Sequence, residues 1–427
     1  MINFAMQRLQ SNFDTAAEEE KMKIIVIGAG AAGLIAAGKA AESGCEVILA
    51  ERNDRIGKKL LITGKGRCNI TNSAEIEDMI SMYPTNPKFL YSALYTFTND
   101  DIVKLIEDNG VKTKVERGGR IFPVSDKAAD VVKALRKYAL KPNVKLVHTR
   151  VKGLVIQNGI VKGVKTDRGI IEADKVIVCT GGKSYPGTGS TGDGYDFARQ
   201  AGHTVTEIKP SLVPLETEEG FVKDIMGLSL KNVKLTAFDD NGKKKYEDFG
   251  EMLFTHFGIS GPMVLSMSSH LKRGKKYKAE IDLKPALDDG KLKTRIMRDF
   301  DKAGKKHLVN SLDALLPKAI IPVIIDKAGI EPHKPVCEST KDERKALIEA
   351  MKHLTLTIKG FRPVEEAIVT SGGVRVSEID PSTMESKKVH GLYFAGEVID
   401  VDGYTGGFNL QAAFSTGYLA GMNAAMD

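Results

Sequence analysis

The sequence contains no tryptophan, and aromatic residues make up only 6% of its 427 residues. Its four cysteines are scattered singly, without a C-x-x-C pair, so they indicate neither a redox dithiol nor a structural zinc site. Isolated cysteines are typical of a reducing compartment, and we therefore expect a cytoplasmic protein. No stretch approaches the roughly 18–20 uninterrupted apolar residues of a membrane-spanning helix, so no membrane partner is expected.

Charge of neither sign dominates the chain: the net charge is +7, and the densest basic run is Leu271–Lys278. A solvated surface is the simpler interpretation of this run, and steering of a nucleic acid or an acidic substrate is the alternative. Because the run lacks interleaved aromatic residues on which bases could stack, we expect no nucleic-acid partner. Residues 1–21 lack the features of a signal peptide, and we interpret them as a flexible leader, with Met22 as an alternative start.

What the sequence does contain is a nucleotide-binding fingerprint between Ile24 and Glu51. An apolar run leads into Gly28, Gly30 and Gly33, spaced G-x-G-x-x-G, and a helical pattern and a second apolar run follow. Such glycines permit a tight turn, close approach of a pyrophosphate and close helix–strand packing, while the helix N-terminus attracts phosphate. An acid that ends the second strand can accept hydrogen bonds from ribose hydroxyls. The pattern predicts a dinucleotide site, and a glycine turn used only for packing is the alternative.

A second fingerprint lies near the C-terminus and favours FAD over NAD. The run Gly391–Asp400, GLYFAGEVID, resembles the strand that approaches the ribityl and pyrophosphate groups of FAD, with Glu397 as its acid. Gly187, Gly189 and Gly192 repeat the G-x-G-x-x-G spacing, but they do not directly follow a strand and no acid ends a following strand. We interpret this second match as a glycine loop over the flavin, so a second dinucleotide domain is not expected.

Five motifs occur in the same order as in one family of flavoproteins. They are KKLLITGKGRCNITNS (Lys58–Ser73), CTGGKSYPGTGSTGDGY (Cys179–Tyr195), LFTHFGISGP (Leu253–Pro262), TSGGV (Thr370–Val374) and GLYFAGEVIDVDGYTGGFNLQ (Gly391–Gln411). From Met22 to Asp427 the chain resembles the BaiN/RdsA-type flavoproteins, which are labelled NAD(P)/FAD-dependent oxidoreductases or aminoacetone-oxidase-like proteins. The resemblance implies a Rossmann-like FAD domain, an inserted β-barrel and a helical piece.

The order of strand and helix patterns agrees with a discontinuous α/β domain that needs both ends of the chain. The expected parts are an FAD-binding part 22–205, a barrel-like insertion 206–283, a helical segment 284–353, a returning barrel strand 354–360 and a second FAD-binding part 361–427. Local signals predict hairpins that turn at 118–119 and at 158–159, and a helix capped by Asp126 that ends near Leu140. Helices are also expected over Leu292–Ala303, Leu312–Ala328 and Glu343–His353.

The fingerprints and the resemblance together name the residues expected to contact FAD. The helix after Gly407 would point its free amides at the flavin, Val151 would offer backbone groups to the adenine, and Arg67 would bind the pyrophosphate or else form a surface ion pair. The full set is Gly28, Gly30, Ala31, Ala32, Gly33, Glu51, Arg52, Lys59, Arg67, Cys68, Asn69, Val151, Thr180, Gly181, Gly396, Glu397, Gly407, Phe408 and Asn409. We expect the FAD to be non-covalent.

The resulting hypothesis is an FAD-dependent oxidoreductase that transfers hydride through flavin N5 to or from a small organic substrate. Without a second dinucleotide domain, NAD(P)H would dock transiently as the reductant. The catalytic candidates are His256, Cys68 and Tyr404, although a structural histidine and an inert buried cysteine are the simpler interpretations of the first two. No metal cluster is apparent. A flavin-dependent nucleic-acid modifier or binder and a non-enzymatic flavin-binding regulator are the alternatives, and the insertion is expected to cover the flavin.

Overall fold

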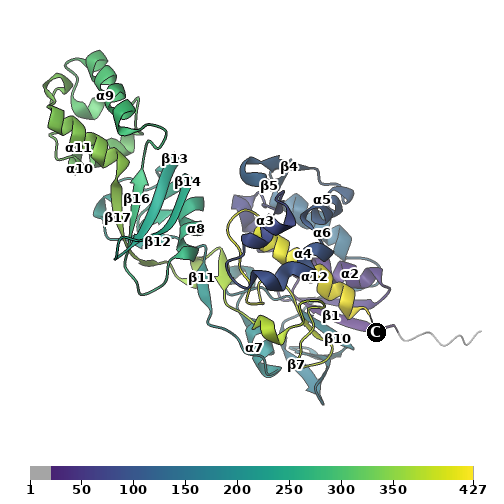
Figure 1. Ribbon diagram of the computed structural model, residues 1–427. Helices are drawn as coiled ribbons and strands as arrows, with labels where there is room; N and C mark the ends of the chain where they lie inside the picture. The colour runs from purple at the N-terminus through teal and green to yellow at the C-terminus, as the bar shows by residue number, and fades with distance from the viewer. Residues whose placement is uncertain (1–20, 427) are drawn as a thin grey trace, which may run out of the picture. The chain divides into compact units, whose positions relative to one another are not determined.

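The computed structural model describes residues 21–426 as two compact units (Figure 1). Unit 1 comprises the chain up to Lys209 and again from Thr370, and unit 2 comprises Pro210–Val369. The chain passes from one unit to the other twice, within β11 (Lys209–Ser211) and within β18 (Val369–Ser371). Apart from Lys21, the predicted leader lies outside the described residues.

Unit 1 is built on a parallel sheet in the order β19-β10-β1-β2-β6. The first strand is buried on both faces, as the 0% exposure of Ile24, Ile25 and Val26 shows, and this burial explains its continuous apolar run. The edge strand β19 comes from the C-terminal part of the chain, so the sheet needs both parts. The strands are β1 (Lys23–Ile27), β2 (Glu46–Glu51), β6 (Val144–His148), β10 (Lys175–Val178) and β19 (Leu392–Phe394).

Helices α2 (Ala31–Glu42) and α12 (Phe408–Ala424) pack closely against one another in unit 1. A Cβ atom on Gly417 would lie 2.4 Å from the carbonyl oxygen of Ala32, and one on Gly421 would lie 2.4 Å from that of Ala36. Only glycine allows the two backbones to approach this closely. The other helices of this unit are α3 (Ile76–Ser81), α4 (Tyr91–Thr96), α5 (Asn99–Asp108), α6 (Ala128–Ala139) and α7 (Asp193–Gln200).

Two small antiparallel sheets complete unit 1, and both predicted hairpins are confirmed. Strands β4 (Thr113–Glu116) and β5 (Arg120–Pro123) pair around residues 117–119, with β3 (Thr71–Asn72) beside β5. Strand β7 pairs with β8 around residues 158–159, and β8 pairs with β9. The three strands of this second sheet are β7 (Val151–Gln157), β8 (Ile160–Thr166) and β9 (Gly169–Glu172).

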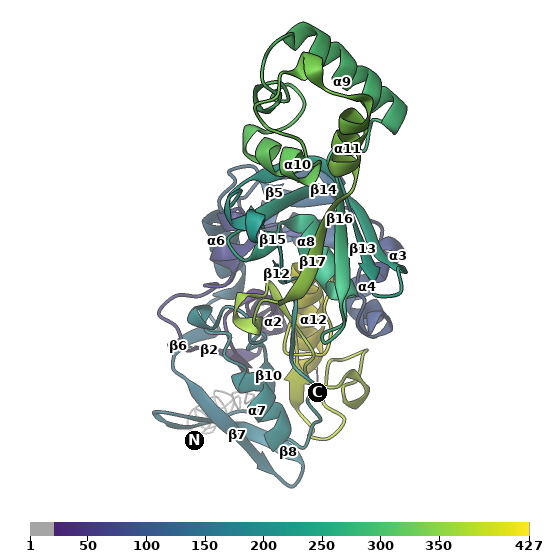
Figure 2. The ribbon, with the colours of Figure 1, turned by 90° about the vertical axis from the view of Figure 1, so that its left-hand side faces the viewer.

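Unit 2 contains a closed barrel of strands in the order β12-β15-β14-β13-β16-β17, with a helical section between β16 and β17 (Figure 2). The Rossmann-type α/β sheet and the inserted barrel with helices confirm the expected fold class. The barrel strands are β12 (Leu215–Thr217), β13 (Ser229–Asp239), β14 (Lys244–Thr255), β15 (Gly258–Ser260), β16 (Tyr277–Asp282) and β17 (Leu354–Phe361). The helices are α8 (Pro262–His270), α9 (Asp289–Ala303), α10 (Ile321–Lys327) and α11 (Lys341–Lys352).

Two local expectations are wrong. The helix expected over 312–328 is an α-helix only from Ile321, because Pro317 cannot continue a helix and restrains the residue before it. Asp126 does not cap α6: Lys127 occupies the N-cap position, and the Asp126 carboxylate instead pairs with Lys114 and Arg67. Among the described residues, no helix is both long and apolar enough to cross a membrane.

Candidate functional site

In the glycine turn after β1, two glycines are required by packing and a third faces open space that a ligand could fill. A Cβ on Gly33 would lie 1.8 Å from the carbonyl oxygen of Gly28, and one on Gly28 would lie 2.6 Å from that of Cys179, so packing alone requires these two glycines. A Cβ on Gly30 would meet nothing within 4 Å. Gly30 is the N-cap of α2, whose first amides attract anions. The open space at Gly30 therefore fits a pyrophosphate, with Ala31 and Ala32 in the first helical turn beside it.

Glu51 braces this turn from the end of β2. The side chain is only 6% exposed. One carboxylate oxygen accepts a 2.8 Å hydrogen bond from the Ala29 amide, and the other accepts from the backbone and side-chain nitrogens of Asn53, at 2.8 and 2.7 Å. A carboxylate oxygen has further lone pairs for a ribose hydroxyl. The ribose contact remains a prediction, whereas the bond to Ala29 is a role that sequence reasoning missed.

Four motif segments meet at one ion pair. The Nζ atom of Lys59 lies 2.7 Å from a carboxylate oxygen of Glu397 and donates a 2.7 Å hydrogen bond to the hydroxyl of Ser184. The amide of Thr370 donates to the other Glu397 oxygen at 2.8 Å. Burial alone would raise the pKa of Glu397, but Lys59 and Thr370 lower it below its ordinary value. The carboxylate is therefore ionised at neutral pH, and it joins chain segments that are far apart in the sequence.

Ser184 and Thr370 were absent from the predicted site, although both lie in motifs that the sequence singled out. The Thr370 hydroxyl accepts hydrogen bonds from the amides of Lys183 and Ser184, at 2.8 and 3.2 Å. A Cβ on Gly182 would lie 2.4 Å from the Thr370 hydroxyl and 2.8 Å from a Glu397 oxygen. This tight fit explains the second glycine in the segment CTGGKS, a signal that pointed to a close approach without naming its partner.

The second G-x-G-x-x-G loop is tied to the end of β2. Arg52 donates a 2.6 Å hydrogen bond to the Thr191 hydroxyl and pairs with Asp193 at 3.3 Å. The Asn53 side-chain nitrogen donates to the carbonyl of Thr188 at 3.0 Å. Strand β10 ends at Val178, well before this loop, so the loop lacks the strand-to-turn context of a dinucleotide fingerprint.

Among the buried polar atoms of the described residues that have no hydrogen-bond partner, two belong to predicted FAD contacts. They are the side-chain oxygen of Asn69 and the hydroxyl of Thr180. Buried polar atoms in folded proteins are nearly always hydrogen-bonded, so such atoms suit a polar ligand. Together with the open space at Gly30, the positive φ of 72° at Gly181 and the carboxylates of Glu51 and Glu397, they fit a bound FAD.

Arg67 forms ion pairs, and Cys68 is a buried thiol. The Arg67 guanidinium lies 2.5 Å from carboxylate oxygens of both Glu116 and Asp126 and 4.2 Å from the ring centre of Phe122. An FAD contact by Arg67 thus remains only a prediction. Cys68 is fully buried, and burial raises the pKa of its thiol to about 11 despite a hydrogen bond with Thr63. A neutral, enclosed thiol is poorly suited to nucleophilic or redox chemistry.

The N-terminus of α12 is fixed by close contacts and hydrogen bonds of the loop that precedes it. A Cβ on Gly407, whose φ is 102°, would lie 2.4 Å from the carbonyl oxygen of Thr71. The Asn409 side chain accepts from the amide of Gly403 at 2.8 Å and donates to its carbonyl at 2.7 Å. Burial raises the pKa of the Tyr404 phenol, which therefore stays protonated at neutral pH. Phe408 opens the helix, and its carbonyl accepts from the Tyr83 hydroxyl at 2.7 Å.

The remaining candidates lie in separate places. Val151 is buried at the start of β7, and a Cβ on Gly396 would lie 2.9 Å from the Cβ of Ala32. His256 lies in unit 2, exposed in the turn between β14 and β15, with its ring 4.9 Å from that of Phe257. Contacts of Val151 with adenine and of His256 with substrate remain predictions. No group of His, Cys, Asp or Glu side chains within residues 21–426 is arranged to hold a metal ion.

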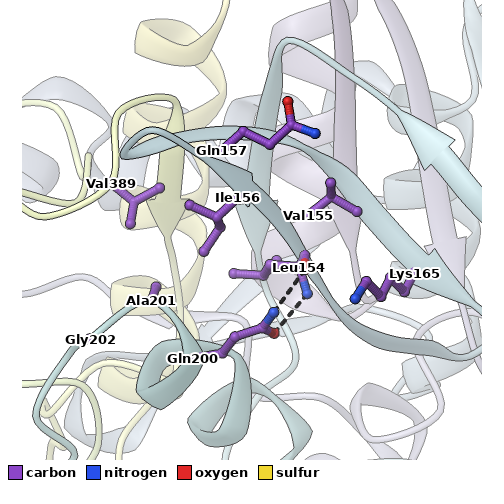
Figure 3. Close-up of a pocket in the computed structure, with 9 residues that line it drawn as sticks. All are labelled: Leu154, Val155, Ile156, Gln157, Lys165, Gln200, Ala201, Gly202 and Val389. Atoms are coloured by element: carbon purple, nitrogen blue, oxygen red, sulfur yellow. Dashed lines mark hydrogen bonds between the residues drawn. The ribbon is translucent and has the colours of Figure 1, made fainter.

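A cavity of about 550 Å³ lies along β7, apart from the glycine turn (Figure 3). The side-chain amide of Gln200 binds both the amide and the carbonyl of Leu154, at 2.9 and 2.8 Å, and so closes part of the strand edge. Leu154, Ile156 and Val389 line the cavity together with the polar side chains of Gln157, Lys165 and Gln200, so its lining is mixed. None of the residues that line it is among the predicted FAD contacts, so it belongs to no part of the candidate site.

Comparison with known proteins reveals clear relatives. A family model described as "HI0933-like protein Rossmann domain" matches residues 22–423. The chain is 36% identical to a 3-dehydro-bile acid delta(4,6)-reductase of Clostridium scindens, over 94% of this chain and 99% of the relative. It is 34% identical to a ribosomal RNA dihydrouridine synthase of Haemophilus influenzae, over 93% of this chain and 97% of the relative. The fold is similar to the open conformation of a flavocytochrome c3 fumarate reductase, with 17% identity, a TM-score of 0.51, and 99% of this chain and 81% of that chain covered.

Proposed function

The chain belongs to the HI0933-like Rossmann family of FAD-dependent oxidoreductases, and from this premise we propose that it reduces a carbon–carbon double bond conjugated to a carbonyl group. Two relatives support this reaction class. The name of one describes reduction of 4,6-double bonds in a 3-oxo bile acid, and the name of the other describes formation of dihydrouridine. In both substrates the double bond is polarised by a carbonyl, so its far carbon accepts hydride.

The described residues are consistent with a reaction in which FAD transfers hydride and the protein binds the cofactor and supplies a proton. Bound FAD supplies hydride transfer through its N5 atom. Gly30 leaves room for the pyrophosphate, Glu51 would hold the ribose, and the first amides of α12 would face the flavin. Tyr404, whose phenol stays protonated at neutral pH, is the candidate to donate a proton to the substrate carbon next to the carbonyl.

Overall, the reaction adds one hydride and one proton to the substrate and oxidises NAD(P)H to NAD(P)+. We propose that NAD(P)H docks transiently, because unit 2 is a barrel with helices and not a second parallel α/β sheet. A transient docking site needs no glycine fingerprint of its own. The organic substrate would then enter after NAD(P)+ has left.

The observation that carries the proposal, through its FAD-binding half, is the convergence of the glycine turn with three motif segments at one edge of the parallel sheet. The glycine turn follows β1, Ser184 follows β10, Glu397 follows β19, and Lys59 lies in the segment after β2. The carboxyl ends of parallel strands meet at the same edge, which is where open α/β folds bind their ligands.

The test is anaerobic stopped-flow spectroscopy of the purified yellow protein. NADH or NADPH should bleach the flavin, and an enone such as a 3-oxo-4-ene steroid should restore the oxidised spectrum with formation of the saturated ketone. A Tyr404→Phe variant should bleach normally but recover slowly. If oxygen restores the colour but no enone does, the reaction class is wrong, and if an amine bleaches the flavin, the enzyme runs in the oxidative direction.

A second candidate substrate is a uridine in RNA. A basic surface of unit 2 supports this candidate, against our expectation of no nucleic-acid partner. Phe238 and Asp239 pair with Lys278 and Tyr277, so the β13–β14 turn lies beside the start of β16. The cations of this surface are Lys243, Lys244, Lys245, Lys272, Arg273, Lys275, Lys276 and Lys278. All of them are exposed except Lys245, which is half-buried.

Such a surface would bind phosphates with an affinity that falls steeply as salt rises. Binding of a uridine-containing RNA hairpin should weaken between 50 and 200 mM salt by about tenfold or more. A Lys275→Glu, Lys276→Glu double variant should bind more weakly than wild type and keep its flavin reduction rate. RNA binding that is absent at low salt, or dihydrouridine formation that is absent when NADPH is present, would leave the small-molecule substrate as the better assignment.

A further inference from the structure

The Lys59–Glu397 pair joins two chain segments that follow different strands of the parallel sheet. Lys59 lies in the segment after β2, whereas Ser184 and Glu397 follow β10 and β19, and the order β19-β10-β1-β2 places β1 and β10 between. The Lys59 and Glu397 side chains are 22% and 19% exposed, and Ser184 is fully buried. A lysine whose ammonium is held by both Glu397 and Ser184 loses rotamer freedom, so its fixed ammonium needs a physical reason.

The strand order also indicates which half of FAD lies near this pair. Glu51 ends β2 and Gly30 follows β1, so the adenosine and the pyrophosphate would lie over these two strands. Neighbouring strands are about 4.8 Å apart, so β19 lies roughly 14 Å beyond β2 along the sheet. A dinucleotide laid across this edge with adenosine at β2 extends its flavin half toward β10 and β19. The ammonium of Lys59 and the carboxylate of Glu397 therefore lie on the flavin side.

Reduction changes the charge of a flavin, so the charges of Lys59 and Glu397 can affect how easily a bound flavin is reduced. The reduced ring gains negative charge, which a nearby cation stabilises and a nearby anion destabilises. In a partly buried site these effects are screened less than at the surface. Lys59 and Glu397 carry opposite charges 2.7 Å apart, so each compensates the other in the intact protein. Removing either charge leaves the other unbalanced next to the cofactor.

We propose that Lys59 and Glu397 act as a charge pair that sets the reduction potential of the bound flavin, with Ser184 holding the ammonium in place. The proposal rests on the FAD-binding half of the proposed function and not on the substrate. Lys59 thus acts on the cofactor through its charge, and Ser184 is the positioning residue that acts through Lys59. The competing explanation is a purely structural latch that joins the segment after β2 to the C-terminal part of the sheet.

The two explanations differ in the sign of a measurable shift. Sulfite adds to flavin N5 and leaves negative charge on the ring, so its dissociation constant reports the local charge without any substrate. Lys59→Gln leaves the Glu397 carboxylate unbalanced and should weaken sulfite binding roughly tenfold, which corresponds to a potential about 30 mV lower for a two-electron couple. Glu397→Gln leaves the ammonium unbalanced and should strengthen sulfite binding by a similar factor.

Two further variants complete the set. Ser184→Ala removes one of the hydrogen bonds of Lys59 and should shift sulfite binding in the direction of Lys59→Gln, by less. Lys58→Gln is the matched control, because Lys58 is 41% exposed and its ion pair with Asp54 is 3.9 Å long. The control should leave sulfite binding unchanged. All four are measured on FAD-loaded protein, with the midpoint potential determined against a reference dye.

Opposite shifts in Lys59→Gln and Glu397→Gln support the charge pair. Shifts of the same sign, or no shift in protein fully loaded with FAD, overturn it. If one of the two variants cannot hold FAD, the other must still shift in its expected direction, and if neither holds FAD the pair is a latch. Because the assay contains no enone and no NAD(P)H, a failure of the proposed reaction leaves this result unaffected.

Discussion

Glu51→Gln tests how one acid supports both the glycine turn and the nucleotide. The wild-type carboxylate accepts three N–H groups, one from Ala29 on one oxygen and two from Asn53 on the other. Glutamine keeps a single acceptor oxygen. If that oxygen faces Asn53, the new NH2 group opposes the Ala29 amide, and if it faces Ala29, the NH2 group opposes both donors of Asn53. Either orientation leaves a donor without its acceptor.

The magnitude follows from the burial of this site. Glu51 is 6% exposed, so water cannot replace the lost acceptor. A buried donor left unpaired costs about 1–3 kcal/mol, and hydrogen bonds to charged groups contribute about 1.5–3 kcal/mol. We therefore expect the unfolding free energy of the apoprotein to fall by about 2 kcal/mol. Loss of the predicted ribose contact should weaken FAD binding by about a further tenfold, or ~1.4 kcal/mol.

Two measurements separate these effects. Urea unfolding of the apoprotein reports the bracing of the turn, and FAD titration at a temperature where both proteins are folded reports the ribose contact. Glu46→Gln is the matched control, because Glu46 is exposed at the other end of the same strand. The rate of flavin reduction at saturating FAD should barely change, since the acid lies at the adenosine end.

Each outcome has a clear consequence. An apoprotein as stable as wild type would show that the bond to Ala29 contributes little, and an unchanged FAD affinity would remove the ribose assignment. A large loss of reduction rate in fully loaded protein would place Glu51 in the redox chemistry, against our expectation.

Three other substitutions test separate parts of the structure. Gly30→Val should leave apoprotein stability nearly unchanged, because its Cβ meets nothing within 4 Å, yet abolish FAD binding, and a variant purified with full FAD would refute the pyrophosphate placement. His256→Ala should keep FAD content and spectrum but lower substrate turnover, and unchanged turnover across a substrate panel would make His256 structural. Burial alone would raise the pKa of Glu378, but Thr204 and Lys388 lower it from 4.5 to about 2. This carboxylate therefore stabilises the fold above pH 4.5 and stops doing so as the pH falls toward 2, so the advantage of wild type over Glu378→Gln should be roughly 3 kcal/mol at pH 7 and shrink across that window. A stability difference in urea unfolding that does not change with pH would contradict this assignment.

Local patterns in the sequence were sufficient for the elements that short-range physics controls. The apolar run before Gly28, the glycine spacing and the acid at Glu51 predicted the first strand, turn, helix and strand, because their period and turn chemistry depend on near neighbours. The hairpins at 118–119 and 158–159 followed from turn residues in the same way. The short alternating strands of the insertion were consistent with a small barrel or a sandwich, and the resemblance favoured the barrel, whose closure no single strand reveals.

Only the tertiary structure decided which partners the charged and polar side chains have. Asp126 is of a residue type that commonly caps helices, but its carboxylate forms ion pairs with Lys114 and Arg67. The bonds of Glu397 to Lys59 and Ser184 join residues that are 338 and 213 positions apart. Such partners depend on how distant loops meet at the edge of the sheet, which the local sequence period does not encode. The sequence alone therefore predicted where a nucleotide could bind, and the fold determined which charged side chains meet at that predicted place.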